Sequence, residues 1–180
     1  MEFNRRGFIK LRAMYLFGAL AFLFVFSVAR ANAEAGDALP QGVRGIYTLE
    51  EWHKDGNVFR PPQVEGRFVL QDGTIMTALH NRIQSPNQTT VLVYGGYQFE
   101  SSTFTYGYDS TSIFTETPSG TTVSHKPLFE GKRSFVTAVE GENIRLRSEG
   151  GKQELLFTSE GLTYSENGQV LRVWRRLSEH

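Results

Sequence analysis

Aromatic side chains are concentrated in one short stretch of the sequence, YGGYQFESSTFTYGYD, residues 94–109. After the opening tyrosine, two aromatic residues precede a pair of serines and three follow it: Tyr97 and Phe99, then Phe104, Tyr106 and Tyr108. Side chains alternate between the two faces of a strand, so each set lies on one face. A tight turn at the serines would bring both sets to the same side. Aromatic rings contact apolar molecules and tyrosine hydroxyls orient them, so the pattern predicts a ligand-binding surface or a packed core.

Charged and titratable residues could add chemistry to this surface. Arg133 shares the parity of Phe135 and could hold a ligand carboxylate, with an exposed arginine at a strand end as the alternative. His80 shares the parity of Met76, and an inward His80 could act as an acid or base. The ligand-binding residues that we expect are Tyr97, Phe99, Phe104, Tyr106, Tyr108, Met76, Arg133 and Phe135, and His80 is the one catalytic candidate.

Several kinds of site are disfavoured by composition. The chain has no cysteine, which excludes disulfides, thiolate metal sites and a cysteine nucleophile. A metal site needs about three convergent ligands, and the four histidines show neither His-x-His nor HExxH spacing. A Gly-x-Ser-x-Gly nucleophile motif is also missing from the sequence. We therefore expect no metal and no cofactor, haem included.

Turn dipeptides divide the sequence into short alternating runs. They are Asp55-Gly56, Asp72-Gly73, Ser119-Gly120, Gly141-Glu142, Gly150-Gly151 and Asn167-Gly168. Asp-Gly and Asn-Gly tolerate the positive φ values of tight hairpins. The strands expected between them are 44–53, 65–71, 74–80, 91–100, 103–109, 111–117, 132–140, 143–149, 152–158, 161–166 and 169–177. Strands joined by hairpins favour a closed antiparallel up-and-down β-barrel of about 8–10 strands, because closure removes unpaired edges.

The outward faces of these strands carry charged residues. Arg145 and Arg147 alternate with apolar neighbours and are expected to pair with acidic side chains on a solvated face. Their expected partners are Glu140, Glu149 and Glu154. A barrel of the outer membrane needs an apolar outer band instead, so the sequence disfavours one.

The first residues read as an export signal. Basic residues, an uncharged apolar run over 13–29 and the small-x-small sequence of 31–33 predict a signal peptide over 1–33, with a flexible lead over 34–42 and the barrel over 43–180. NRRGFIK resembles a twin-arginine signal, and the general secretory route is the alternative. We expect a periplasmic or secreted protein without a stable membrane span after cleavage; an uncleaved anchor is the alternative.

The net charge of the chain after this segment disfavours one class of partner. The formal net charge is +0, but five of 19 basic residues and one of 19 acidic residues precede position 34, which leaves 14 − 18 = −4 for the remainder. A mildly acidic body disfavours nucleic acid as a partner. The sequence makes no prediction of the oligomeric state.

The ends of the predicted barrel resemble those of the bacterial lipocalin-like domains. GIYTLEEW (45–52) is similar to their Gly-x-Trp opening strand, LRVWRRL (171–177) to their closing Trp-x-Arg strand, and EGRFVLQDGTIM (65–76) to their second hairpin. The resemblance implies that Gly45, Tyr47, Trp174 and Arg176 join the first and last strands. It also implies that a small lipophilic ligand binds inside the barrel.

Three functions follow from this sequence. The first is an exported barrel that binds a small, mainly apolar molecule in its interior. The second is a cofactor-free cyclase or isomerase acting on a lipophilic substrate there. The third is a packed barrel without a ligand, acting through its outer surface.

Overall fold

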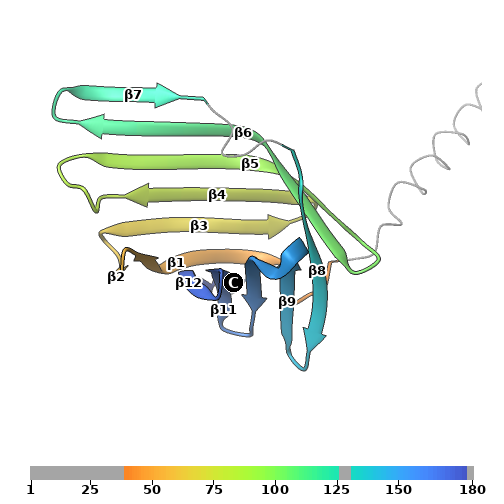
Figure 1. Cartoon of the computed structure of the whole chain (residues 1–180). Coiled ribbons are helices and arrows are strands. Elements are labelled where there is room, and N and C mark those ends of the chain that lie inside the picture. Colours follow the sequence, from red (N-terminus) through yellow and green to blue (C-terminus); the bar gives the residue numbers. More distant parts are fainter. Residues whose placement is uncertain (1–38, 126–130, 178–180) are drawn as a thin grey trace, which may run out of the picture. The chain divides into compact units, whose positions relative to one another are not determined.

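Short antiparallel strands make up most of the structure. The computed structural model describes residues 39–125 and 131–177 (Figure 1). The strands are β1 (Gly45–Lys54), β2 (Asn57–Phe59), β3 (Val64–Gln71), β4 (Thr74–Asn81), β5 (Gln88–Glu100), β6 (Thr103–Thr117), β7 (Gly120–Ser124), β8 (Arg133–Glu140), β9 (Asn143–Ser148), β10 (Gln153–Phe157), β11 (Gly161–Glu166) and β12 (Gln169–Arg176). One 3-10 turn, Glu149–Gly151, separates β9 from β10. The expected signal peptide lies outside the described residues.

The sheet closes on itself. Consecutive strands pair in the order β1-β3-β4-β5-β6-β8-β9-β10-β11-β12, and β12 pairs again with β1. The prediction of a closed antiparallel up-and-down barrel is therefore confirmed, with ten strands in the ring. The two short strands β2 and β7 lie outside the ring, where they pair antiparallel with β1 and β6, respectively; neither was among the expected strands.

Strand β6 is longer than the sequence suggested. The two strands expected over 103–109 and 111–117 are one, because Asp109 is accommodated as a bulge: Tyr94 pairs with Ser110 but Gly95 pairs with Tyr108. The first part of β6 pairs with β8 and its far part pairs with β7. Figure 1 shows the hairpin end of β5 and β6 reaching β8.

The bulge explains one glycine of the aromatic stretch. A Cβ atom on Gly95 would lie 1.9 Å from the carbonyl oxygen of Gly107, so the two backbones approach too closely for any side chain. Glycine is required at position 95 because of this contact between the two backbones.

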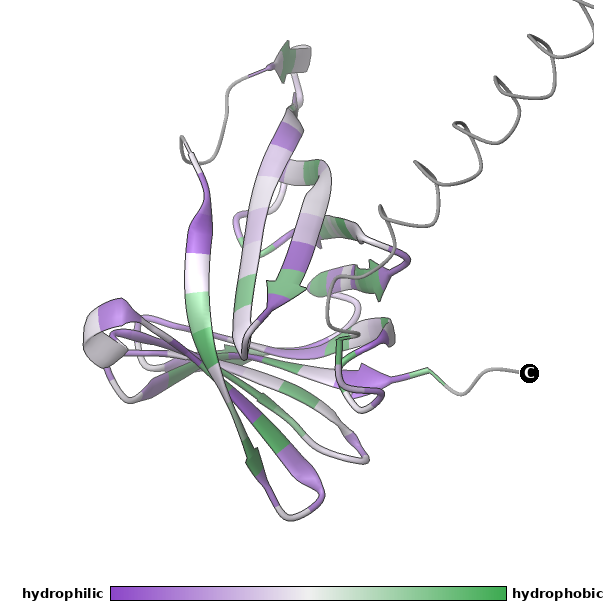
Figure 2. Ribbon diagram, turned by 90° about the vertical axis from the view of Figure 1, so that its right-hand side faces the viewer, coloured by the Kyte–Doolittle hydropathy of each residue, from purple (hydrophilic) through white to green (hydrophobic). Residues whose placement is uncertain are grey.

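The turn at Ser101 and Ser102 explains why the aromatic residues occupy odd positions before it and even positions after it. Both serines have positive φ, 47° and 65°, as a two-residue hairpin turn requires. Phe99 consequently pairs with Phe104, and Tyr97 with Tyr106. The five aromatic side chains pack against the same buried core, and hydrophobic positions alternate along the strands in Figure 2.

The closed end of the barrel is built around Tyr47, which is fully buried. Its hydroxyl donates to the carbonyl of Val43 at 2.8 Å and accepts from Nη2 of Arg176 at 2.8 Å. The guanidinium carbon of Arg176 lies 4.9 Å from the centre of the Tyr47 ring. Burial raises the pKa of Tyr47 to about 12, so the hydroxyl stays protonated.

Neighbouring residues complete this end. Arg176 also donates to the carbonyls of Arg44 and Gly42. A Cβ on Gly45 would lie 2.8 Å from Nη1 of Arg176, so the glycine makes room for the guanidinium. Trp174 is buried and its ring centre lies 5.9 Å from that of Phe68. Leu39, which we assigned to the flexible lead, is buried in the core as well.

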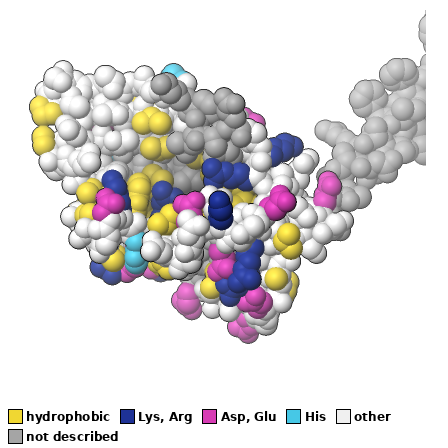
Figure 3. Space-filling view, viewed as in Figure 1, with side chains coloured by type: hydrophobic (Ala, Val, Ile, Leu, Met, Phe, Trp, Pro, Cys, Tyr) yellow, Lys and Arg dark blue, Asp and Glu magenta, His cyan; other side chains and the backbone are white. Residues whose placement is uncertain are grey.

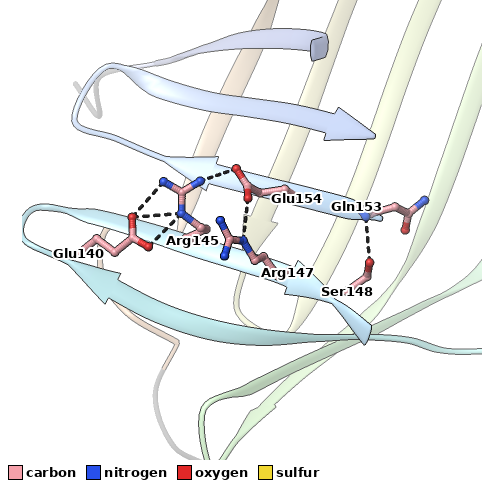
Figure 4. A network of polar contacts seen from close by, with 6 residues as sticks. All are labelled: Glu140, Arg145, Arg147, Ser148, Gln153 and Glu154. Carbon is pink, nitrogen blue, oxygen red and sulfur yellow. Dashed lines mark hydrogen bonds and ion pairs between the residues drawn. The ribbon is translucent and has the colours of Figure 1, made fainter. Parts of the chain in front are cut away.

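The outer face of β8 to β10 carries an ion-pair network. Acidic and basic side chains lie side by side over this end of the molecule in Figure 3. Arg145 bonds to Glu140 at 2.9 Å and also to Glu154, and Arg147 bonds to Glu154 at 2.8 Å (Figure 4). The hydrogen bond from Arg145 lowers the pKa of Glu140. Glu149, the third expected acidic partner, has no ion pair within the described residues.

The two adjacent glycines in β5 provide a test of the bulge. Gly95→Ala should lower the free energy of unfolding by about 2–4 kcal/mol, because its methyl group would collide with backbone. Gly96→Ala is the matched control, since its Cβ would meet only the carbonyl oxygen of Gly73 at 3.5 Å. Urea denaturation measures both; equal stabilities of the two variants would contradict the proposed geometry.

Candidate functional site

The barrel interior contains a cavity of about 220 Å³. Most of its wall is apolar and is formed by inward side chains of β3 to β6, of β8 and of β10 to β12: Phe68, Leu70, Ile75, Leu79, Val91, Val93, Phe104, Phe135, Leu155, Leu162 and Trp174. A filled small barrel would leave no such space, because protein interiors normally contain few voids larger than a water molecule. The interior is therefore partly hollow.

Strand alternation decides which residues reach the cavity. On β4 the inward positions are odd-numbered, with Ile75 at 2% exposure and Thr77 at 8%. On β5 the inward positions are also odd, so that Val93 lines the cavity whereas its neighbour Leu92 is 44% exposed on the outside. Successive side chains of each strand thus point in turn into the cavity and into the solvent.

A polar group of side chains occupies one part of the wall. It consists of Thr77, Tyr106, Tyr108, Arg133, Tyr164 and Arg172. Tyr106 shares a hydrogen bond with Arg133, and Tyr108 shares one with Thr77. The hydroxyl of Tyr164 accepts from Nε2 of Gln153 at 3.1 Å. We refer to these six residues as the polar wall.

Arg172 is held between two aromatic rings. Its guanidinium carbon lies 4.7 Å from the centre of the Trp52 ring and 5.9 Å from that of Tyr164. Both aromatic residues are its direct neighbours on the adjacent strands, Trp52 on β1 and Tyr164 on β11. Cation-π contacts of this kind contribute roughly 0.5–2 kcal/mol each, depending on desolvation.

A second bulge makes this arrangement possible. Leu49 pairs with Trp174 but Glu51 pairs with Val173, so Glu50 is an extra residue in β1. After the bulge the inward positions of β1 change from odd to even, and Trp52 turns toward Arg172 instead of away from it. Outside the barrel, Nε of Arg175 donates to Oε1 of Glu50 at 2.8 Å.

At least one hydrogen-bond donor of Arg172 is unsatisfied within the described residues. Its Nε is buried and has no hydrogen-bond partner in the described part of the chain. Burial lowers the pKa of its guanidinium, which nonetheless remains charged at neutral pH. Glu166 contributes an opposite charge nearby, but it accepts from Nε2 of Gln153 at 3.4 Å and forms no ion pair with Arg172 within the described residues.

The tyrosines of the polar wall are neutral hydroxyl groups. Burial raises the pKa of Tyr106, Tyr108 and Tyr164 above the ordinary value for tyrosine, although Arg133 lowers each of them somewhat. A tyrosine with a raised pKa donates hydrogen bonds but is a poor general base at neutral pH. The polar wall is thus suited to hold acceptor groups of a bound molecule.

Five of the expected ligand-binding residues do line the cavity. They are Phe104, Tyr106, Tyr108, Arg133 and Phe135. Tyr97 and Phe99 pack against the core but lie beyond the cavity wall. The alternative of Arg133 as an exposed strand-end arginine does not hold. Arg133 lies opposite Tyr106 in the pairing of β8 with β6, and both side chains line the cavity.

Two expected residues lie on the other face. Met76 is 39% exposed and pairs with Tyr94 on the outside of the barrel. His80 shares its parity and is also outside, where Nδ1 bonds to Oγ1 of Thr90 at 2.7 Å and Nε2 to Oε1 of Gln88 at 3.1 Å. The expectation of an inward Met76 and His80 was wrong, because the apolar odd positions Ile75 and Leu79 take the inner face of β4.

Sequence reasoning missed the most unusual residue of the site. In LRVWRRL, Arg172 shares its parity with Trp174, one of the residues expected to join the first and last strands. This shared parity could have placed Arg172 on the same face as Trp174. Trp52 could not have been found in this way, because the bulge at Glu50 reverses the parity that the sequence displays.

Other kinds of site find little support in the structure. Residues 39–125 and 131–177 hold no cluster of three histidine, aspartate or glutamate side chains that could bind a metal ion. Nor do they contain a helix long and apolar enough to cross a membrane.

Comparisons with known proteins do not assign the chain to a group. Neither a family model, nor a curated protein, nor a solved structure matches it. The functional argument therefore rests on the cavity and on the residues that line it.

Two arginines of β12 allow a test of the polar wall. Arg172→Met should change the free energy of unfolding by less than about 1 kcal/mol, because the lost cation-π contacts are offset by removal of a buried charge. Arg176→Met should lower it by roughly 3 kcal/mol, since Arg176 bonds to Tyr47 and to two carbonyls. Thermal and urea unfolding measure both; a loss at Arg172 as large as that at Arg176 would show that Arg172 is structural.

Proposed function

We propose that this protein is an exported, lipocalin-like barrel that binds a small, mainly apolar molecule in its interior. The observation that carries the proposal is the cavity of about 220 Å³ inside a closed barrel, with an apolar wall interrupted by one polar group of residues. Ligand sites in proteins commonly combine an apolar lining with a few polar groups that fix the orientation of the ligand.

The size of the cavity limits the ligand. A cavity of roughly 150 Å³ lined by apolar side chains holds one benzene molecule in another protein. By proportion, the space of about 220 Å³ here suits a molecule of about nine non-hydrogen atoms. Transfer of its apolar surface from water stabilises the complex by about 25 cal/mol per Å².

The two alternative functions have less support. A cyclase or isomerase would need a general base, but His80 lies outside the barrel and the inner tyrosines have raised pKa values. A packed barrel that acts only through its surface does not account for the cavity. No observation in the described residues favours either alternative over binding.

Export is proposed from the sequence of the first 33 residues. If the signal is cleaved after the small residues at 31–33, the mature protein should begin near Glu34 and be found in the periplasm or the medium. N-terminal sequencing of the protein from fractionated cells measures this. An intact N-terminus in the membrane fraction would instead indicate an uncleaved anchor.

Filling the cavity should abolish binding of a neutral apolar probe. We expect 1-octanol to bind the protein and to change the fluorescence of its two tryptophans, because Trp174 lines the cavity and Trp52 lies beside Arg172. Val93→Phe places a ring in the cavity and should weaken 1-octanol binding by at least about tenfold.

Leu92→Phe is the matched control. It adds a similar ring one residue away, on the outer face of the same strand, and should leave the affinity for 1-octanol unchanged. Circular dichroism and urea unfolding show whether both variants are folded. Folded Val93→Phe protein that binds 1-octanol as tightly as the original chain would refute an interior site.

A further inference from the structure

The polar wall offers many hydrogen-bond donors and few acceptors. It carries the guanidinium groups of Arg133 and Arg172, and an arginine side chain has five N–H donors and no acceptor. Among the described residues that line the cavity, none is an aspartate or glutamate. A cation in such surroundings is costly unless an anion compensates it.

Arg172 has the geometry of an anion-binding side chain. Trp52 and Tyr164 lie near the guanidinium at 4.7 Å and 5.9 Å and restrict its movement. Its Nε is enclosed and lacks a hydrogen-bond partner in the described residues. Hydrogen bonds of a guanidinium lie in its plane, and its fork matches the two oxygens of a carboxylate.

The protein does not supply that carboxylate within the described residues. Glu166 influences Arg172 electrostatically but its oxygen bonds to Gln153 at 3.4 Å. Arg133 is engaged with Tyr106, so it adds positive potential and orients a hydroxyl toward the same region. The apolar cavity begins directly beside these groups, since Trp174 and Leu162 line it from the same two strands as Arg172 and Tyr164.

We infer that the ligand is a small monocarboxylate, whose head group binds the guanidinium of Arg172 and whose apolar part fills the cavity. This inference rests on the proposed function and names the ligand class for the same site. The inner tyrosine hydroxyls donate further hydrogen bonds to the carboxylate. The volume of about 220 Å³ leaves room for about nine non-hydrogen atoms of the acid.

Three probes with the same eight-carbon chain test the inference. They are octanoate, 1-octanol and octylamine, which have eight carbon atoms each and carry a carboxylate, a neutral hydroxyl and an ammonium head group, respectively. Hydrogen bonds to charged groups contribute about 1.5–3 kcal/mol, so octanoate should bind about 10- to 100-fold more tightly than 1-octanol at neutral pH. Octylamine, a cation, should bind more weakly than 1-octanol. Isothermal titration calorimetry measures the three affinities.

Removal of the guanidinium should abolish the preference for the acid. In Arg172→Met, octanoate should bind no more tightly than 1-octanol, whereas the affinity for 1-octanol should change by less than about threefold, because the cavity is kept. Arg147→Met is the control: it removes one positive charge from the outer face of β9, where Arg147 bonds to Glu154. This variant should retain the full preference for octanoate.

The outcomes separate the two proposals. Equal affinities of the original chain for octanoate and 1-octanol would overturn the carboxylate assignment but leave interior binding intact. A preference for octanoate that persists in Arg172→Met would overturn the role of Arg172. If none of the three probes binds, both the carboxylate assignment and the proposed function fail.

Discussion

The barrel depends on the contact between its first and last strands. β1 and β12 are the first and last strands of the ring, and each would be an open edge of the sheet if they did not pair. Tyr47 and Arg176 hold this seam together through a ring contact, a shared hydrogen bond and carbonyls on the segment before β1. The cavity exists only because this seam closes, since every lining strand is positioned by its two neighbours in the ring.

The interior combines two opposite uses of arginine. Arg176 has its hydrogen bonds satisfied by the protein and stabilises the closed end. Arg172, four residues earlier on the same strand, keeps a buried nitrogen without a partner in the described residues. A residue of the second kind is expensive for the folded state. The proposed ligand class follows from the position of this nitrogen beside the apolar cavity.

Much of the fold follows from local sequence signals. Turn dipeptides and alternating apolar residues predict ten of the strands and the closed ring, and the serine turn predicts that the rings of Phe104 and Tyr106 share a face with Tyr97. Parity alone did not decide which face is inner, so Met76 and His80 were misplaced. The bulges at Glu50 and Asp109 also escaped prediction, because each shifts the phase of the alternation within a run of polar residues, where no apolar side chain reveals the shift.

The bulge at Glu50 decides what faces Arg172. It takes up one extra residue of β1, so that Trp52 lies opposite Arg172 and packs against the interior, while Glu50 pairs with Arg175 outside. A regular strand of the same sequence would place Glu51 opposite Arg172 instead, because its inward positions would all be odd-numbered. One local irregularity of the backbone thus determines whether the guanidinium lies beside an aromatic ring or beside an opposite charge.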